Sequence, residues 1–205
     1  MTLPAVTLIA LLAFLAAAYR LGVRRLIAPR FARSRETPAD HGLPYEDVHF
    51  ATCDGLRLHG WFVPAEAPRG TIIFCHGHGG TPAHDLSYVP ALRARGYNVL
   101  LFDFRAHGQS EGRFTSLGYF ERRDLLAAIG YLEGRGIRRV GLLGFSMGAA
   151  VAMATAPDAP AVAAVVADCG FAELWHAAAR GALEWGVPYP LAGAIGWLIV
   201  LLASL

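Results

Sequence analysis

The sequence of 205 residues contains no lysine, and all 18 of its basic residues are arginine. The absence of lysine excludes a Walker-type phosphate loop, a Schiff-base enzyme and a Ser-Lys dyad. Charged residues are also scarce, at 17% of the chain, whereas apolar residues make up 55% and the mean hydropathy is +0.39. This composition excludes a disordered protein and suggests that part of the chain is inserted in a membrane.

Cysteine is rare as well. The three cysteines, Cys53, Cys75 and Cys169, are odd in number and have no metal-type spacing, which predicts reduced thiols and excludes a disulfide scaffold. His76 and His78 lack a third ligand at a spacing typical of zinc sites. We therefore expect neither a metal nor a cofactor.

Negative charge is absent from the first 35 residues. Six arginines lie between Arg20 and Arg35, and the first acidic residue is Glu36. From Glu36 onward, 12 arginines stand against 16 acidic residues. The chain therefore consists of a basic segment at 20–35, which we call the basic collar, and a mildly acidic body. This distribution argues against nucleic acid as a partner.

The first 23 residues form an apolar segment. Residues 3–19 carry no charge, and Arg20 can direct its guanidinium to the headgroups while residues 21–23 extend the apolar run. A helix of this length crosses a hydrocarbon core of about 30 Å. Because the arginines follow the segment, whereas a signal peptide carries its charges before it, we expect a single-pass transmembrane anchor at 1–23, a basic linker at 24–44 and a body on the cytoplasmic side. A cleaved leader and a buried helix of a soluble protein are the alternatives.

From residue 45 the pattern predicts alternating strands and helices. Asp54-Gly55 is typical of a hairpin turn between two strands, and Leu125, Ala128, Ile129 and Leu132 mark one face of a helix. The predicted strands are 46–52, 56–63, 71–75, 97–103, 140–145 and 161–167, and the predicted helices are 82–95, one containing residues 125–132, and 147–156. This order indicates an α/β fold with a mostly parallel sheet, helices on both faces and ligands at the carboxyl ends of the strands.

The motif Gly144-x-Ser146-x-Gly148 lies between the predicted strand 140–145 and the helix 147–156. In this setting a sharp turn exposes the serine hydroxyl at the end of the sheet, and the glycines allow the helix to approach the strand closely. The start of the helix also offers positive potential to a developing oxyanion. Ser146 is therefore the candidate nucleophile, and a helix-capping serine is the alternative.

A glycine-rich loop at 76–80, His-Gly-His-Gly-Gly, directly follows the predicted strand 71–75. Glycines allow such a loop to turn its backbone N–H groups inward, where they can hold an oxyanion. The expected donors are the N–H of Met147 and the N–H of His78.

With these motifs the chain resembles the α/β-hydrolase superfamily, and most of all its serine aminopeptidase-like and acyl-hydrolase branch, which includes membrane-anchored esterases and protein depalmitoylases. The resemblance covers residues 45–182 and depends on the segments 76–80, 103–110, 144–148 and 168–171. It implies a structural role for Asp103 and His107 in a polar loop, with contacts to the substrate as the alternative.

The order of a catalytic triad in this fold is serine, acid, histidine. Asp168, after the strand 161–167, is the candidate acid, with a turn role as the alternative. His176 is the only histidine after Ser146. Its position in a predicted helix favours an ordinary histidine of an amphipathic helix over the catalytic base. The chain is expected to lack the last two strands of the hydrolase sheet and to be truncated at its C-terminus. Residues 183–205 are expected to form an apolar cap or a second membrane segment.

The sequence thus leaves two functions open. One is a membrane-anchored serine hydrolase that cleaves an ester, thioester or amide of a small molecule, an acylated protein or a lipid through a Ser146 acyl-enzyme. The other is a truncated hydrolase-fold protein that is catalytically impaired or inactive, with a binding role or no defined role.

Overall fold

The computed structural model describes residues 36–173 together with residues 24, 27–31, 188, 191, 193, 194 and 197. The expected anchor at 1–23, His176 and most of 183–205 lie outside the described residues. Among the helices of the described part, none is both long and apolar enough to cross a bilayer.

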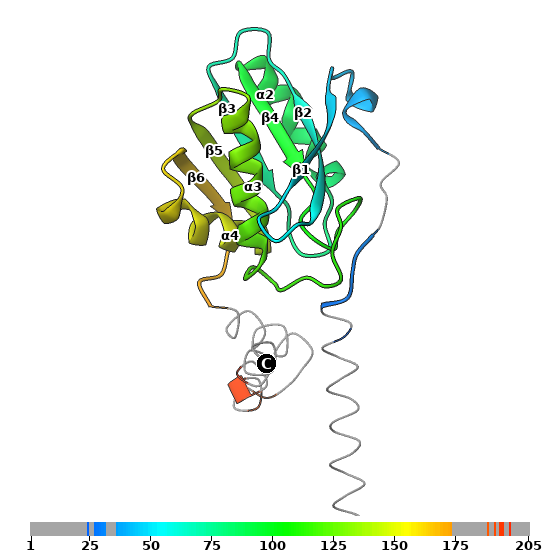
Figure 1. Ribbon diagram of the computed structural model, residues 1–205, viewed down its shortest axis with the longest axis vertical. Helices are drawn as coiled ribbons and strands as arrows, with labels where there is room; N and C mark the ends of the chain where they lie inside the picture. Colours follow the sequence, from blue (N-terminus) through cyan, green and yellow to red (C-terminus); the bar gives the residue numbers. More distant parts are fainter. Residues whose placement is uncertain are drawn as a thin grey trace, which may run out of the picture.

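Six strands form one mixed sheet in the order β1-β2-β4-β3-β5-β6 (Figure 1). β1 and β2 form the predicted hairpin, β2 runs antiparallel to β4, and β4, β3, β5 and β6 are parallel. The α/β class is confirmed, and each strand begins and ends within one residue of its prediction. The strands are β1 (Glu46–Ala51), β2 (Arg57–Val63), β3 (Gly70–Cys75), β4 (Tyr97–Phe102), β5 (Val140–Phe145) and β6 (Val162–Asp168).

Helices cover both faces of the sheet. α3 (Glu121–Gly134) and α4 (Met147–Thr155) lie on one face, and α2 (Val89–Ala94) lies on the other (Figure 1). The predicted apolar face of α3 is confirmed, since Leu125, Ala128, Ile129 and Leu132 are all buried. A hydrophobic core therefore lies on each side of the sheet, one under α3 and α4 and the other under α2.

The helix predicted over 82–95 is instead two short elements. Pro82–Tyr88 is a 3₁₀ helix, η2, and only Val89–Ala94 is α-helical. Pro90 has no N–H and its ring would collide with the carbonyl of Leu86, so a continuous α-helix cannot form there. The Leu86 carbonyl accepts a hydrogen bond from the N–H of Val89 instead, which is the tighter 3₁₀ pattern.

Two parts of the basic linker at 24–44 have defined structure. Pro38–His41 is a short 3₁₀ helix, η1, held by a capping box between Thr37 and Asp40 and ended by Gly42 at φ 66°. Further upstream, the N–H of Arg30 donates to the Ala106 carbonyl at 2.6 Å. The linker is thus attached to the body at the carboxyl end of the strands.

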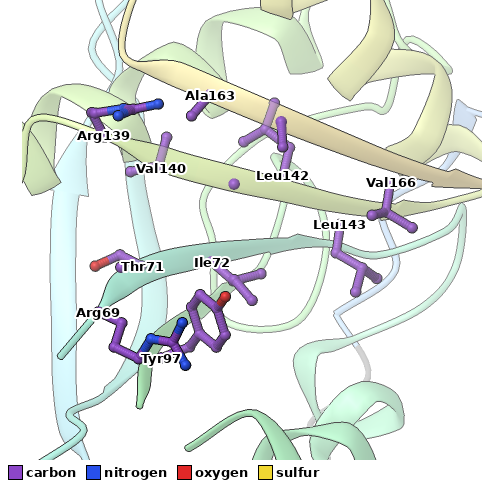
Figure 2. Close-up of a pocket in the computed structure, with 13 residues that line it drawn as sticks. Arg69, Thr71, Ile72, Tyr97, Arg139, Val140, Leu142, Leu143, Ala163 and Val166 are labelled. Carbon is purple, nitrogen blue, oxygen red and sulfur yellow. The ribbon is translucent and has the colours of Figure 1, made fainter. Parts of the chain in front are cut away.

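An apolar trough lies along β3, β5 and β6, on the sheet face that carries α2. It has a volume of about 430 Å³ and is lined by Ile72, Leu143 and Val166, with Arg69, Tyr97 and Arg139 gathered at one end (Figure 2). No helix in the described part of the chain covers it, and Val166 is 59% exposed. β6 is the edge of the described sheet and is mostly exposed along its length.

Candidate active site

Ser146 is the single residue that connects β5 to α4. Its backbone has φ 51° and ψ −112°, a left-handed conformation that is strained for a residue with a side chain. The N–H of Ser146 donates to the Asp168 carbonyl at 2.8 Å, which extends the β5–β6 ladder to the turn. The chain therefore changes from strand to helix within one residue and leaves Ser146 exposed at the carboxyl end of the sheet.

The two glycines of the motif allow this turn because no side chain would fit at either position. A Cβ on Gly148 would lie 1.9 Å from the Cys75 carbonyl oxygen, and a Cβ on Gly144 would lie 2.6 Å from the backbone nitrogen of Ala149. α4 thus packs directly on the ends of β3 and β5, which brings its N-terminus next to the loop at 76–80.

The loop at 76–80 lies against the Ser146 turn. A Cβ on Gly77 would be 3.5 Å from the Cβ of Ser146, and the loop turns back through a 2.9 Å hydrogen bond from the N–H of Gly80 to the Gly77 carbonyl. His78 is half-buried in this loop. Met147 is the first residue of α4, so its N–H has no partner within the helix. Three predicted site residues, Ser146, Met147 and His78, therefore come from two neighbouring segments.

Two buried histidines join this loop to the loop that follows β4. Nε2 of His76 accepts the N–H of Phe104 at 3.0 Å, and Nε2 of His107 accepts the N–H of Gly79 at 3.1 Å. Each Nδ1 donates to a backbone carbonyl, that of Gly77 for His76 and that of Arg105 for His107. Both rings are therefore neutral and carry their proton on Nδ1.

Electrostatics favours the same neutral form. Burial, together with a smaller contribution from the neighbouring His107 ring, lowers the pKa of His76 to about 4. Burial also lowers the pKa of His107. The structural role predicted for His107 is thus observed, and its contact with Gly79 adds a connection to the glycine-rich loop.

Asp103 is a second predicted structural residue, and it too is buried. Its Oδ2 lies 3.3 Å from Nδ1 of His59, whose Nε2 lies 2.6 Å from Oδ1 of Asp47. Burial opposes the positive charge on His59, but the Asp103 and Asp47 carboxylates outweigh it and raise the pKa of His59. Asp103 also accepts the N–H of Gln109, so it connects β2 to the loop after β4.

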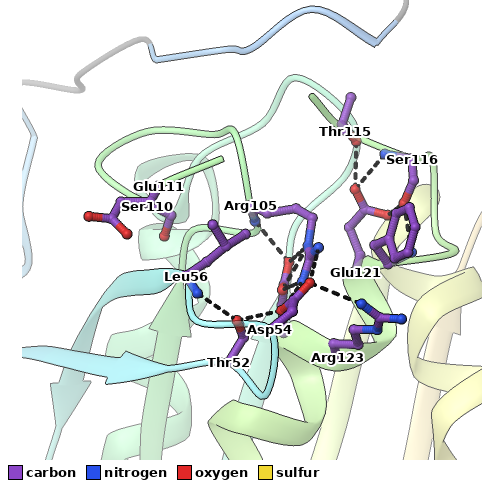
Figure 3. A network of polar contacts seen from close by, with 12 residues as sticks. Thr52, Asp54, Leu56, Arg105, Ser110, Glu111, Thr115, Ser116, Glu121 and Arg123 are labelled. Carbon is purple, nitrogen blue, oxygen red and sulfur yellow. Dashed lines mark hydrogen bonds and ion pairs between the residues drawn. The ribbon is translucent and has the colours of Figure 1, made fainter. Parts of the chain in front are cut away.

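The loop at 103–120, between β4 and α3, is held by a polar network (Figure 3). Arg105 forms ion pairs with Asp124 at 2.7 Å and with Asp54 at 2.9 Å. Glu121, which is fully buried, accepts the hydroxyl of Thr115 and the N–H of Ser116, each at 2.8 Å. Sequence reasoning did not identify these contacts, because the partners of Arg105 lie 51 and 19 residues away and no motif marks the local contacts of Glu121.

Asp168 lies one strand away from Ser146, and its backbone carbonyl, rather than its carboxylate, contacts the Ser146 turn. Its side chain is exposed and adjoins the thiol of Cys169, whose pKa it raises. Within the described ranges, no histidine forms a hydrogen bond with the Ser146 hydroxyl, and His176 lies outside them. The same residues contain no group of three His, Cys, Asp or Glu placed to hold a metal ion.

Comparison with known proteins decides the family. Residues 70–192 match the family model for the alpha/beta hydrolase fold, which is more than half of the chain. The chain belongs to the α/β-hydrolase family.

Relatives with known sequences and structures agree with this assignment. The hydrolase chain is 36% identical to the Bacillus subtilis protein YqkD over 58% of its own length and 40% of YqkD. It is 33% identical to the Arabidopsis thaliana alpha/beta hydrolase domain-containing protein WAV2, over 67% of its own length and 46% of WAV2. It thus spans about half the length of these relatives.

Among solved structures, the chain is similar to the Pyrococcus furiosus esterase Pf2001. The TM-score is 0.73 and the sequences are 32% identical, over 85% of this chain and 68% of the esterase. The fold of the described part is therefore that of an esterase-like α/β-hydrolase.

Proposed function

We propose that this α/β-hydrolase is a serine hydrolase that cleaves an ester, thioester or amide through an acyl-enzyme on Ser146. The observation that carries the proposal is the strained, exposed Ser146 at the start of α4, directly against the glycine-rich loop at 76–80. A serine in this conformation costs free energy, and strain of this kind is concentrated at functional sites. The likeness to the Pyrococcus furiosus esterase supports the same reaction class.

In the proposed reaction, Oγ of Ser146 bonds to the acyl carbon while the carbonyl electron pair moves onto oxygen. The N–H groups of Met147 and His78 then hold this oxyanion, and each such donor contributes a factor of about 10² to 10³ in rate. Collapse of the tetrahedral intermediate expels the alcohol, thiol or amine with a proton, and water releases the acid in the second half-reaction.

The proton of the Ser146 hydroxyl needs an acceptor. Asp168, at the end of β6 beside Ser146, is the proposed orienting acid. An impaired or inactive hydrolase-fold protein with a binding role is the second candidate function, because the described side chain of Asp168 is exposed and it is the backbone carbonyl of Asp168 that binds the Ser146 turn. A serine hydroxyl without a base is a weak nucleophile near neutral pH.

The proposal also places the protein at a membrane. Residues 1–23 act as the anchor, with the body on the cytoplasmic side, because the basic collar follows the apolar segment. An anchor of this kind favours acyl substrates, either of a lipid, of an acylated protein or of a small hydrophobic molecule. Retention of the full chain in the membrane pellet after alkaline carbonate extraction tests the anchor.

A fluorophosphonate probe tests the nucleophile, because it reacts covalently with an activated serine. The full chain in detergent is expected to be labelled, whereas Ser146→Ala is expected to remain unlabelled. Circular dichroism checks that both proteins are folded, and Ser87→Ala, at an exposed serine of η2, is the control for loss of a hydroxyl elsewhere. A folded wild-type protein without labelling would favour the inactive alternative.

A further inference from the structure

Three exposed aromatic side chains lie on the segments that border the carboxyl end of the strands. Phe31 is 52% exposed, Phe114 is 43% exposed and Tyr119 is 75% exposed. We call these three residues the aromatic rim. Arg30 and Arg113 directly precede two of them in the sequence and are exposed as well.

Hydrogen bonds join the two segments that carry the rim. The N–H of Arg30 donates to the Ala106 carbonyl at 2.6 Å, and the Arg30 carbonyl accepts the N–H of Gly108 at 3.0 Å. The Ile27 carbonyl accepts the N–H of Thr115 at 3.0 Å. Residues 27–31 therefore lie along the loop at 103–120, and Phe31 belongs to the same edge of the molecule as Phe114.

The rim is held in a defined conformation. The Phe120 ring contacts both Phe114 and Tyr119, at centroid distances of 6.0 and 4.9 Å. Buried Glu121 holds the backbone between Phe114 and Tyr119 through the N–H groups of Ser116 and Gly118. An apolar surface kept rigid and exposed in this way is typical of an interaction surface.

The rim adjoins the proposed catalytic residues. His107, between Ala106 and Gly108, accepts the N–H of Gly79 in the glycine-rich loop. The Thr115 hydroxyl contacts the sulfur of Met147, the residue after the proposed nucleophile. A partner bound at the rim would therefore lie next to the segments that carry the Ser146 site.

The length of chain before the rim identifies the partner. Only four residue steps separate Val23, the end of the proposed anchor, from Ile27, and four steps span at most about 14 Å. The headgroup layer on each side of the hydrocarbon core is several Å thick. This step rests on the proposed function, in which residues 1–23 cross the membrane, and it puts residues 27–31 at or just beneath the headgroups.

We propose that the aromatic rim lies in the headgroup layer of the membrane and opens the Ser146 site toward the bilayer, so that the substrate is an acyl ester drawn from the lipid phase. Aromatic side chains are enriched at the interface between membrane and water, and exposed arginines are attracted to anionic headgroups. The partner is thus a phospholipid bilayer with anionic lipids.

Spin labels report directly on which edge of the molecule lies in lipid. The full chain, with the exposed Cys53 and Cys169 replaced by serine, receives a single label through Phe114→Cys or Tyr119→Cys. Cys75 stays unlabelled because it is buried and burial raises the pKa of its thiol. The control label is Glu66→Cys, in the exposed loop before β3 at the opposite end of the strands.

The labelled proteins are reconstituted in nanodiscs of phosphatidylcholine and phosphatidylglycerol. Labels at 114 and 119 should be more accessible to oxygen, which concentrates in lipid, than to a water-soluble nickel chelate, and the label at 66 should show the reverse. The proposal is overturned if the rim labels are as accessible to nickel as the control, if all three labels behave as lipid-exposed, or if the chain does not remain with the nanodiscs.

A second measurement separates the rim from the nucleophile. For a long-chain fluorophosphonate dissolved in the bilayer and a short water-soluble one, the ratio of labelling rates should fall about tenfold in the variant F114D/Y119D. Leu126→Asp, at an exposed apolar residue of α3, should keep the wild-type ratio. An unchanged ratio in the rim variant would contradict the inference, whereas no labelling of any protein would count against the proposed function and leave the spin-label result to decide the rim.

Discussion

The loop at 103–120 and the apolar trough along β3, β5 and β6 adjoin the same sheet but differ in how their side chains are stabilised. In the loop and at the start of α3, charged side chains such as Arg105 and Glu121 are buried and have their partners within the described chain. In the trough, apolar side chains such as Val166 remain exposed. The loop is thus held by buried polar contacts to neighbouring segments, whereas the side chains of the trough gain little from burial in the described part.

This difference shows where the site is made rigid. The loop includes Ala106 and Leu117, which hold left-handed backbone conformations at φ 57° and 56° without being glycines. Such strain persists only where the surroundings determine the conformation strongly. The ion pairs of Arg105 and the hydrogen bonds of Glu121 fix the backbone conformation of this loop. The hydrogen bond from the N–H of Gly79 to His107 then joins it to the glycine-rich loop.

The largest change in the free energy of unfolding is expected when Arg105, at the centre of the polar network, is replaced. Arg105→Ala leaves the fully buried Asp124 carboxylate without its ion pair. The free energy of unfolding should fall by about 3 to 5 kcal/mol, because an unpaired buried charge is costly. Urea denaturation of the full chain in detergent measures the change.

The matched control is Arg57→Ala, because Arg57 pairs with Glu111 at the surface, 3.9 Å away. Its cost should be under about 1 kcal/mol, since exposed ion pairs contribute little. Equal costs for the two substitutions would mean that the buried network does not stabilise the loop.

A change of pH is expected to have an intermediate effect on the free energy of unfolding. The folded protein holds the pKa of His76 near 4, below the ordinary 6.5, because the ring is buried. As the pH falls from 6.5 toward 4, the unfolded state therefore binds the proton first, and the stability that is complete above pH 6.5 is lost by roughly 1 kcal/mol per pH unit. Comparison with His76→Gln, which keeps an acceptor for the N–H of Phe104 but does not titrate, isolates this contribution.

His59 should behave in the opposite way. Its carboxylate partners raise its pKa, so its contribution to stability is complete below pH 6.5 and is lost as the pH rises through the folded-state pKa. Unfolding curves of His59→Gln at pH 6 to 9 should therefore lose this dependence. If both histidine variants kept the wild-type profile, neither ring would be linked to folding.

The smallest effect is expected in the trough. Val166→Ala should change the free energy of unfolding by less than about 0.5 kcal/mol, because the side chain is already 59% exposed. Leu142→Ala on the neighbouring strand, at 1% exposed, should cost about 2 to 5 kcal/mol. A loss of more than about 1 kcal/mol for Val166→Ala would show that the trough is covered in solution.

Local patterns determined the elements of this protein. The apolar runs at 71–75 and 140–145 predict β3 and β5 because a strand buried on both faces needs a continuous apolar stretch. Asp54-Gly55 predicts the β1–β2 hairpin, and the glycines around Ser146 predict the turn into α4, since both signals act between neighbouring residues. The prediction of one helix over 82–95 was wrong although Pro90 is itself a local signal, since a proline inside a helical stretch removes one N–H and breaks the helix.

Only the tertiary structure decided the contacts between distant residues. The partners of Arg105, Asp54 and Asp124, lie 51 and 19 residues away, and residues 27–31 bind a loop more than 70 residues further along the chain. Nor does the sequence show which nitrogen of His76 or His107 carries the proton. A backbone N–H that arrives from another loop makes that choice, and such an encounter depends on the packing of the whole sheet.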